Sequence, residues 1–295
     1  MRRGASVMVA ALLAAALARF GLEQGALGGG LPNGASDVVG QVVTDAATSA
    51  EPGSGGGETA PGSGSAAASS GAASNSVGSA ATGPGSAAYA PTAWDPSASP
   101  EYYRVAGPAV VGEVPAPGEV RYGGLDALGR TQGVVANVDY ARYEAARGHE
   151  THFDAEDDPS GWGHNAKVTI QVPGGKAYHG YLWNRSHLLA DSLGGEAARE
   201  NVVTGTRTQN VGANDGEGGM AYEETRVRDW LRSHPEGTVY YAATPAYVGD
   251  ELVPRSVFVD VRTSDGTIDE HVEVYNAAAG YTIGYADGTF APSGE

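Results

Sequence analysis

The clearest hydrophobic pattern lies in the C-terminal part of the chain, where short runs rich in Val and Tyr stand near turn sequences. Short runs of β-branched and aromatic residues bounded by turn residues are typical of strands. The pairs Gly249-Asp250 and Asp265-Gly266 lie between runs, Asp287-Gly288 follows the last one, and all three favour tight turns. The pattern therefore predicts a β meander with strands over Val239–Ala242, Ser256–Val261, His271–Tyr275 and Tyr281–Tyr285.

Further upstream, the same reasoning predicts a hairpin. Apolar residues alternate with polar ones over Lys167–Val172, and Pro173-Gly174-Gly175 is a turn sequence. A second strand is expected over Tyr178–Trp183. His187 would lie just beyond the hairpin, at the start of an irregular segment that runs to Asn210.

Two segments have apolar residues at helical spacing. They predict one helix over Asn137–Arg147, with Val138, Ala141 and Ala145 on one face, and another over Met220–Leu231. Strands outweigh helices, and both kinds of element are expected to pack into a single α+β domain.

The N-terminal part of the chain has no such pattern. Residues 1–18 combine a basic start with an apolar run and a small-residue end, which is typical of a signal peptide. The apolar run, Ala5 to Ala18, is shorter than the roughly 20 residues that span a bilayer, although an uncleaved signal anchor stays an alternative. Residues 19–117 are interpreted as a mostly disordered linker of Ala, Gly, Ser and Pro, and the folded domain as residues 118–295, beginning near Gly118.

Composition narrows the chemistry. The chain has no cysteine, which excludes disulfides, thiolate zinc sites and cysteine nucleophiles. Its formal net charge of −17 opposes non-specific attraction to nucleic acid. Fields between exposed charges fade over about 8–10 Å at physiological salt, however, so a local arginine cluster can still bind phosphate.

Candidate catalytic residues gather in two nearby segments, Trp183–Ala190 and Asn201–Asn210. An imidazole takes up a proton near neutral pH, an amide oxygen can hold a hard metal ion, and a guanidinium grips phosphate. His187, Asn210 and Arg185 therefore point to a metal-assisted phosphodiester hydrolase. Asparagine is also a common cap and turn residue, and a continuous helix over Asn201–Asn210 would turn its two ends to opposite sides unless it broke near Gly205.

Other constellations fit less well. His149-Glu150-Thr151-His152 has one residue too few between Glu and the second His for a zincin helix. The acidic residues of 154–158 lack the order of a calcium loop and are expected to be a solvated loop. Ser186, His187 and Asp191 offer the residue types of a triad, but the chain has no nucleophile elbow.

The stretch from Trp183 to Trp230 resembles the DNA/RNA non-specific endonuclease family, and most of all its bacterial secreted DNase branch. The resemblance rests on Asn184-Arg185-Ser186-His187, which stands where the family has Asp-Arg-Gly-His. It extends over about Gly118 to Phe290 through the segments Ser186–Ala190, Asn201–Arg207, Gly219–Glu224 and Leu125–Arg130. Asn184 and Ser186 depart from the family's acid and glycine.

The resemblance implies a ββα-metal core, in which a hairpin and a helix hold one divalent ion, usually Mg²⁺. By position, His187 matches the general base and Asn210 the direct metal ligand. Asn201 matches a second asparagine near the site, Glu224 the acid that supports metal-bound water, and Arg185 the motif arginine. Arg207 is a further candidate for phosphate contact.

The sequence thus predicts a secreted or cell-surface anchored endonuclease that cleaves DNA, with RNA as a second candidate substrate. The expected metal ion is Mg²⁺, for which Mn²⁺ is a candidate substitute. No stable protein partner is evident, and the N-terminal segment could serve as a membrane anchor. The rival hypothesis is a surface-tethered nucleic-acid-binding or adhesion module that keeps the fold without the activity. An exported antibacterial toxin would share the chemistry and differ in having an immunity partner.

Overall fold

The computed structural model describes residues 89–148, 152–172, 176–213 and 217–294. The expected signal segment, the linker up to residue 88, the His149–Thr151 part of the zincin-like sequence and the turn at 173–175 lie outside the described residues. Within the described ranges, the helices are too short or too polar to cross a bilayer.

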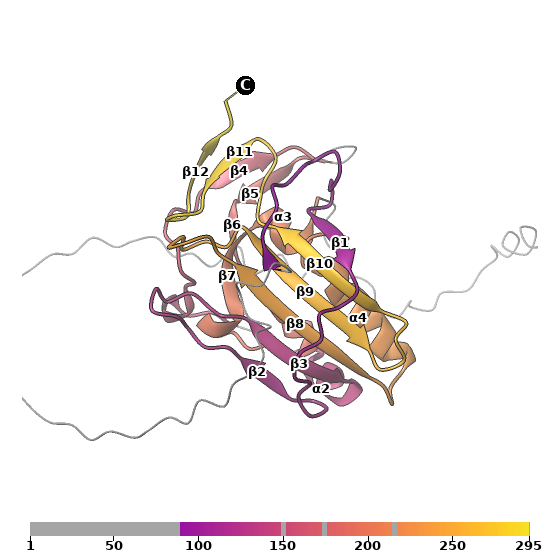
Figure 1. Ribbon diagram of the computed structural model, residues 1–295. Helices are drawn as coiled ribbons and strands as arrows, with labels where there is room; N and C mark the ends of the chain where they lie inside the picture. Colours follow the sequence, from indigo (N-terminus) through magenta and orange to yellow (C-terminus); the bar gives the residue numbers. More distant parts are fainter. Residues whose placement is uncertain (1–88, 149–151, 173–175, 214–216, 295) are drawn as a thin grey trace, which may run out of the picture. The chain divides into compact units, whose positions relative to one another are not determined.

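The main element is a six-stranded sheet in which every pair of neighbours is antiparallel (Figure 1). Its strand order is β1-β10-β9-β8-β3-β2. Three of the predicted meander strands are confirmed as β8, β9 and β10, which lie side by side. The strands are β1 (Tyr103–Gly107), β2 (Val120–Tyr122), β3 (Val134–Asp139), β8 (Thr238–Ala246), β9 (Ser256–Thr263) and β10 (Asp269–Tyr275).

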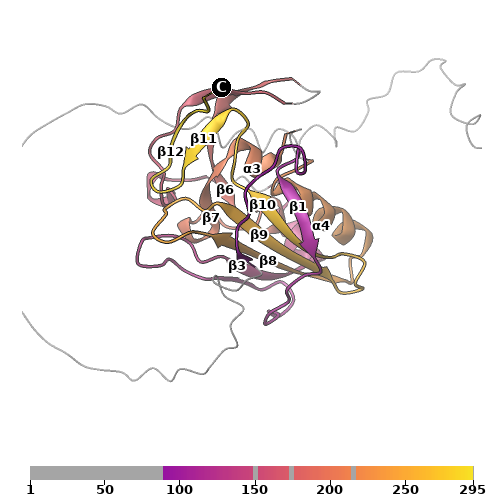
Figure 2. The same cartoon turned by 45° about the horizontal axis from the view of Figure 1, so that its top comes forward.

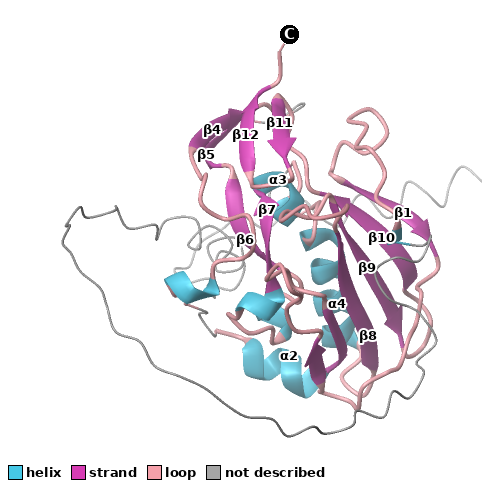
Figure 3. Ribbon diagram, turned by 60° about the vertical axis from the view of Figure 1, so that its left-hand side comes forward, coloured by secondary structure: helices cyan, strands magenta, loops and turns pink. Residues whose placement is uncertain are grey.

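Two helices cover one face of this sheet: α2 (Tyr140–Ala146) and α4 (Ala221–Ser233) (Figure 3). The main apolar core lies between them and the sheet. The helix predicted over Met220–Leu231 is confirmed as α4. The helix predicted over Asn137–Arg147 begins later, because Val138 belongs to β3 and Asp139 caps the helix by accepting a hydrogen bond from the Arg142 backbone. The predicted buried face is also wrong, since α2 buries Tyr143 and Ala146 and leaves Ala141 and Ala145 exposed.

Two smaller hairpins lie together at one end of the large sheet, next to β6 (Figures 1 and 2). The predicted hairpin is confirmed as β4 (Lys167–Ile170) and β5 (Tyr178–Tyr181). The strand predicted over Tyr281–Tyr285 forms as β11 (Tyr281–Gly284), but it pairs with β12 (Thr289–Pro292) and does not extend the meander. A second apolar cluster, which includes Ile170, Leu182, Trp183, Val253 and Ala278, joins these hairpins.

The segment from Trp183 to Val211 forms a strand–strand–helix unit. Strand β6 (Trp183–His187) pairs antiparallel with β7 (Val202–Thr206), and α3 (Arg207–Val211) follows directly. The expectation of an irregular segment up to Asn210 is therefore wrong. The connection from β6 to β7 carries two 3₁₀ turns, Asp191–Leu193 and Arg199–Asn201.

The folded domain also starts earlier than Gly118. Residues 89–117 cross the sheet face opposite the helices and supply its edge strand β1. The Val110 backbone donates to Asp260 (2.7 Å), and the Thr92 backbone donates to Glu273 (2.7 Å), two acids that are fully buried. A buried carboxylate needs such donors to offset its desolvation. The described part of the expected linker is thus an integral layer of the domain.

Candidate active site

His187 is the last residue of β6 and lies opposite Val202 in β7. Its Nε2 atom is buried and has no hydrogen-bond partner among the described residues. Burial lowers the pKa of His187 to about 4, so the ring is neutral at pH 7. The Phe153 ring packs beside it, with 5.1 Å between the ring centroids. A neutral imidazole with an unoccupied nitrogen can accept a proton.

Arg185, two residues earlier on the same face of β6, is held in a fixed orientation. Its Nε and Nη2 atoms donate to Oδ1 of Asp158, at 2.9 and 2.5 Å. The guanidinium carbon also lies 5.5 Å from the centre of the Phe153 ring and 5.0 Å from that of Trp162. Phe153 therefore contacts both Arg185 and His187, and the three form one cluster. Asp158 has a structural partner, which corrects the expectation that 154–158 is only a solvated acidic loop.

Asn210 lies on α3 and reaches back to β6. Its Oδ1 accepts a hydrogen bond of 3.1 Å from the Oγ atom of Ser186, the neighbour of His187. The structure thus brings Asn210 within one residue of the candidate base. An amide oxygen keeps a second lone pair after one such bond, and oxygen is the donor that Mg²⁺ prefers.

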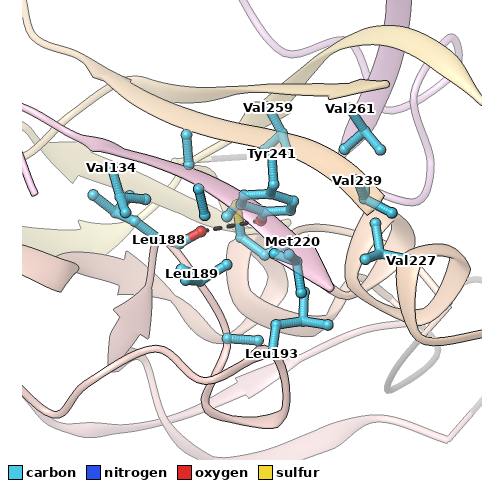
Figure 4. Close-up of a cluster of buried hydrophobic side chains, with 14 of the residues drawn as sticks. Val134, Leu188, Leu189, Leu193, Met220, Val227, Val239, Tyr241, Val259 and Val261 are labelled. Atoms are coloured by element: carbon cyan, nitrogen blue, oxygen red, sulfur yellow. Dashed lines mark hydrogen bonds between the residues drawn. The ribbon is translucent and has the colours of Figure 1, made fainter. Parts of the chain in front are cut away.

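Glu224 occupies the first turn of α4. Burial raises its pKa to about 7, and the positive charge of Arg228 opposes this effect. The Tyr241 hydroxyl donates to the carbonyl of Leu188, the residue after His187, at 3.0 Å (Figure 4). Burial raises the pKa of Tyr241, and the negative charge of Glu224 raises it further. Arg228 was not among the predicted site residues, although its place one helical turn after Glu224 was a usable signal.

Asn201 is fully buried, and within the described residues its side chain bonds to backbone atoms alone. Its Oδ1 accepts from the Leu189 backbone N–H (2.9 Å), and its Nδ2 donates to the carbonyls of Leu189 (3.0 Å) and Glu196 (2.9 Å). These contacts fix the chain that follows His187. These bonds are consistent with a positioning role for Asn201, the second asparagine that the resemblance implies near the site.

Arg207, the further candidate for phosphate contact, is also largely buried. It is 5% exposed, and its guanidinium carbon lies 5.3 Å from the centre of the Tyr178 ring. A side chain buried in this way is not presented to a phosphate on the surface, so we treat it as part of the packing between α3 and β5.

A cleft of about 590 Å³ opens beside Arg185. Asp158 and Trp162, the two residues that hold the Arg185 guanidinium, form part of its wall, whereas His187 does not line it. The remaining lining residues come from four connecting segments: Leu128, Ala155, Glu156, Pro159, Ser160, Gly161, Arg199 and Leu252.

Comparison with known proteins agrees with this arrangement. The profile of the DNA/RNA non-specific endonuclease family matches residues 120–289, and the chain belongs to this family. This membership, together with the β6–β7–α3 unit, confirms the expected ββα-metal nuclease fold.

The chain is 36% identical over 197 residues to a deoxyribonuclease of Streptococcus dysgalactiae subsp. equisimilis. This stretch covers 58% of the chain and 60% of that relative, so the chain spans less than two thirds of the relative's length. Among solved structures, the Sda1 nuclease with bound zinc ion is 34% identical, with a TM-score of 0.66 over 68% of this chain and 100% of the other. NucA from Streptococcus agalactiae with bound magnesium is 26% identical, with a TM-score of 0.48 over 59% and 78% of the two chains.

Proposed function

We propose that this protein is a secreted, divalent-metal-dependent endonuclease that hydrolyses phosphodiester bonds of DNA. The observation that carries the proposal is the placement of three groups at one end of β6. The Nε2 atom of His187 is buried and neutral, Arg185 is fixed two residues away, and Asn210 bonds to the residue between them. The name of the streptococcal relative, a deoxyribonuclease, favours DNA as substrate, with RNA as the second candidate. The signal-like sequence of residues 1–18 supports export.

In the proposed mechanism, the Nε2 atom of His187 takes a proton from the water that attacks phosphorus. Arg185, oriented by Asp158, contacts the non-bridging oxygens, where negative charge grows as the bond to the 3′ oxygen breaks. The product then carries a 5′ phosphate, as the family resemblance implies. Asn201 and Tyr241 keep the backbone after His187 in place throughout.

The residues present suit a hard divalent ion. Asn210 would supply an amide oxygen, and Glu224 would hold bound water. A nearby cation would favour the ionised form of Glu224, whose pKa burial has raised. The described residues contain no cluster of three His, Asp or Glu side chains fit for a metal, so most ligands would be water, as Mg²⁺ prefers. When bound, the ion would supply positive charge at the phosphate and the leaving oxygen. The similar Sda1 nuclease was solved with zinc, which supports a divalent ion without fixing which one.

The rival is a nucleic-acid-binding or adhesion module on the same fold. The net charge of −17 and the Ala/Gly/Ser/Pro-rich region before the domain favour this alternative. The neutral His187 imidazole and the Arg185 guanidinium held by Asp158 favour the enzyme hypothesis. Binding alone requires neither a buried neutral imidazole nor a fixed partner for Arg185.

The test is cleavage of supercoiled plasmid by the purified protein with Mg²⁺, Mn²⁺, Zn²⁺ or EDTA, with an RNA of similar length as second substrate. We expect nicking and then linearisation with at least one of the ions and none with EDTA. Asn210→Ala should lose this activity. Plasmid binding without cleavage under all of these conditions would favour the binding module.

A further inference from the structure

We propose that the cleft beside Arg185 holds the nucleic-acid strand next to the scissile phosphate, and that Arg199 binds a backbone phosphate there. This inference rests on the proposed nuclease function and deepens it by assigning a second phosphate subsite. It concerns a residue outside the group that the family resemblance implies.

The position of the cleft is the first argument. Its wall includes Asp158 and Trp162, and both contact the guanidinium of Arg185. A strand whose scissile phosphate lies at Arg185 would therefore pass directly into or out of this cleft. The volume of about 590 Å³ lies within the range of pockets that bind small ligands. The indole of Trp162 and the exposed side chain of Leu128 give apolar surface for a base or sugar.

The state of Arg199 is the second argument. Arg185, beside the cleft, pairs with Asp158, and Arg130, two residues after the lining residue Leu128, pairs with Asp126. Arg199 forms no ion pair with any carboxylate of the described residues, and its buried Nε has no hydrogen-bond partner among them. A guanidinium without a counter-charge, at the wall of a cleft, is suited to bind an anion. A phosphodiester supplies that anion.

The surroundings hold Arg199 in place for this task. It belongs to the 3₁₀ turn Arg199–Asn201, where the carbonyl of Glu200 accepts a hydrogen bond from Thr131. Its guanidinium packs on Gly129, where an added Cβ would come within 2.9 Å of Nη2 and where φ is +73°. The glycine in Leu125–Arg130 thus makes room for the arginine, which gives a physical reason for this sequence.

Acidic side chains in the cleft limit how much it contributes to nucleic-acid affinity. Glu156 and Asp158 also line it, and only Asp158 is balanced by Arg185. We therefore expect one phosphate contact and no broad basic track. A single contact changes the slope of log affinity against log salt by about 1.

The experiment compares the full-length protein with Arg199→Gln, Arg199→Lys and a matched control, Arg232→Gln, which removes an exposed arginine from α4. Binding of a fluorescein-labelled 12-nucleotide single strand is measured in Ca²⁺ at several salt concentrations. Steady-state cleavage is then measured with a 30-nucleotide substrate and with bis(p-nitrophenyl) phosphate, which is too short to reach both subsites. Thermal melting checks that each variant is folded.

For Arg199→Gln we expect Kd and KM for the oligonucleotides to rise about 10-fold and the salt slope to fall by about 1. The kcat and the rate on the small ester should stay within about 2-fold, Arg199→Lys should recover most of the binding, and the control should match the wild type. Unchanged Kd and salt slope in Arg199→Gln would overturn the inference, as would equal losses on both substrates. The binding assay does not need turnover, so failure of the wild type to cleave would count against the proposed function alone.

Discussion

Replacing Asn201 with alanine separates a positioning role from a chemical one. The side chain is fully buried and makes three hydrogen bonds, of 2.9, 3.0 and 2.9 Å, all to backbone atoms. Each such bond contributes about 1 kcal/mol, and each stranded buried partner adds a desolvation penalty. We therefore expect Asn201→Ala to lower the free energy of unfolding by about 3–5 kcal/mol, a large share of the 5–15 kcal/mol typical of folded proteins.

The assay is urea denaturation, followed by tryptophan fluorescence, with activity measured on the same samples. Asn210→Ala is the matched comparison, because among the described residues the Asn210 side chain has a single hydrogen bond, from Ser186. It should cost about 1 kcal/mol or less of stability while removing activity. If Asn201→Ala stayed within 1 kcal/mol of the wild type yet lost activity as fully as Asn210→Ala, the positioning argument would be refuted.

Three further predictions follow from the same structure. A chain cut immediately before Gly118 should unfold at a lower urea concentration than one starting at residue 89, because it loses the donors to two buried carboxylates; equal midpoints would show that the added layer contributes nothing. Gly205→Ala should destabilise by about 1–3 kcal/mol, since its Cβ would collide with Gln209 and lie 2.6 Å from the Cβ of Ser186; a neutral effect would mean that β6 and α3 are less tightly packed. NMR titration of His187 in the metal-free protein should give a pKa near 4, below the ordinary value of 6.5. Because the unfolded chain then binds this proton more readily, the free energy of unfolding should fall as the pH drops from about 6.5 through 4. A measured pKa of 6.5 would contradict the burial argument.

Much of the fold could be predicted because its strongest elements carry their pattern locally. β8, β9 and β10 are short runs rich in Val, Tyr and other strand-forming residues, with turn sequences between them, and α4 has apolar residues at helical spacing. β6 and β7 could not be found in this way. β6 is only five residues long, and it is mainly polar although largely buried, so burial there does not follow hydrophobicity.

The start of the folded domain before Gly118 could not be predicted for a different reason. Residues 89–117 are held by partners more than 100 positions away, such as Asp260 and Glu273. Locally, only its aromatic residues, such as Tyr89, Trp94 and Tyr102, distinguish this segment from the linker before it. Contacts over such distances arise only from the finished fold.

For the site, local sequence identified the residue types but not which of them face the chemistry. The motif put His187 and Arg185 on one segment, which forms β6, and Asn210 bonds to Ser186 between them. It could not show that Asn201 and Arg207 are turned into the protein, because both occupy the same segment as Asn210. Asp158 and Arg199 reach the site from loops whose position depends on tertiary packing.

The central claim is that His187 acts as the base of a nuclease. The most direct measurement is cleavage of supercoiled plasmid by His187→Gly, with and without added imidazole, in the presence of the divalent ion that supports wild-type activity. We expect the variant to be about 10²–10⁴-fold slower than the wild type and imidazole to restore part of the rate, since it can enter the space left by the ring and take up the proton. A folded variant that cleaves at the wild-type rate, or one that imidazole leaves inactive, would contradict the account.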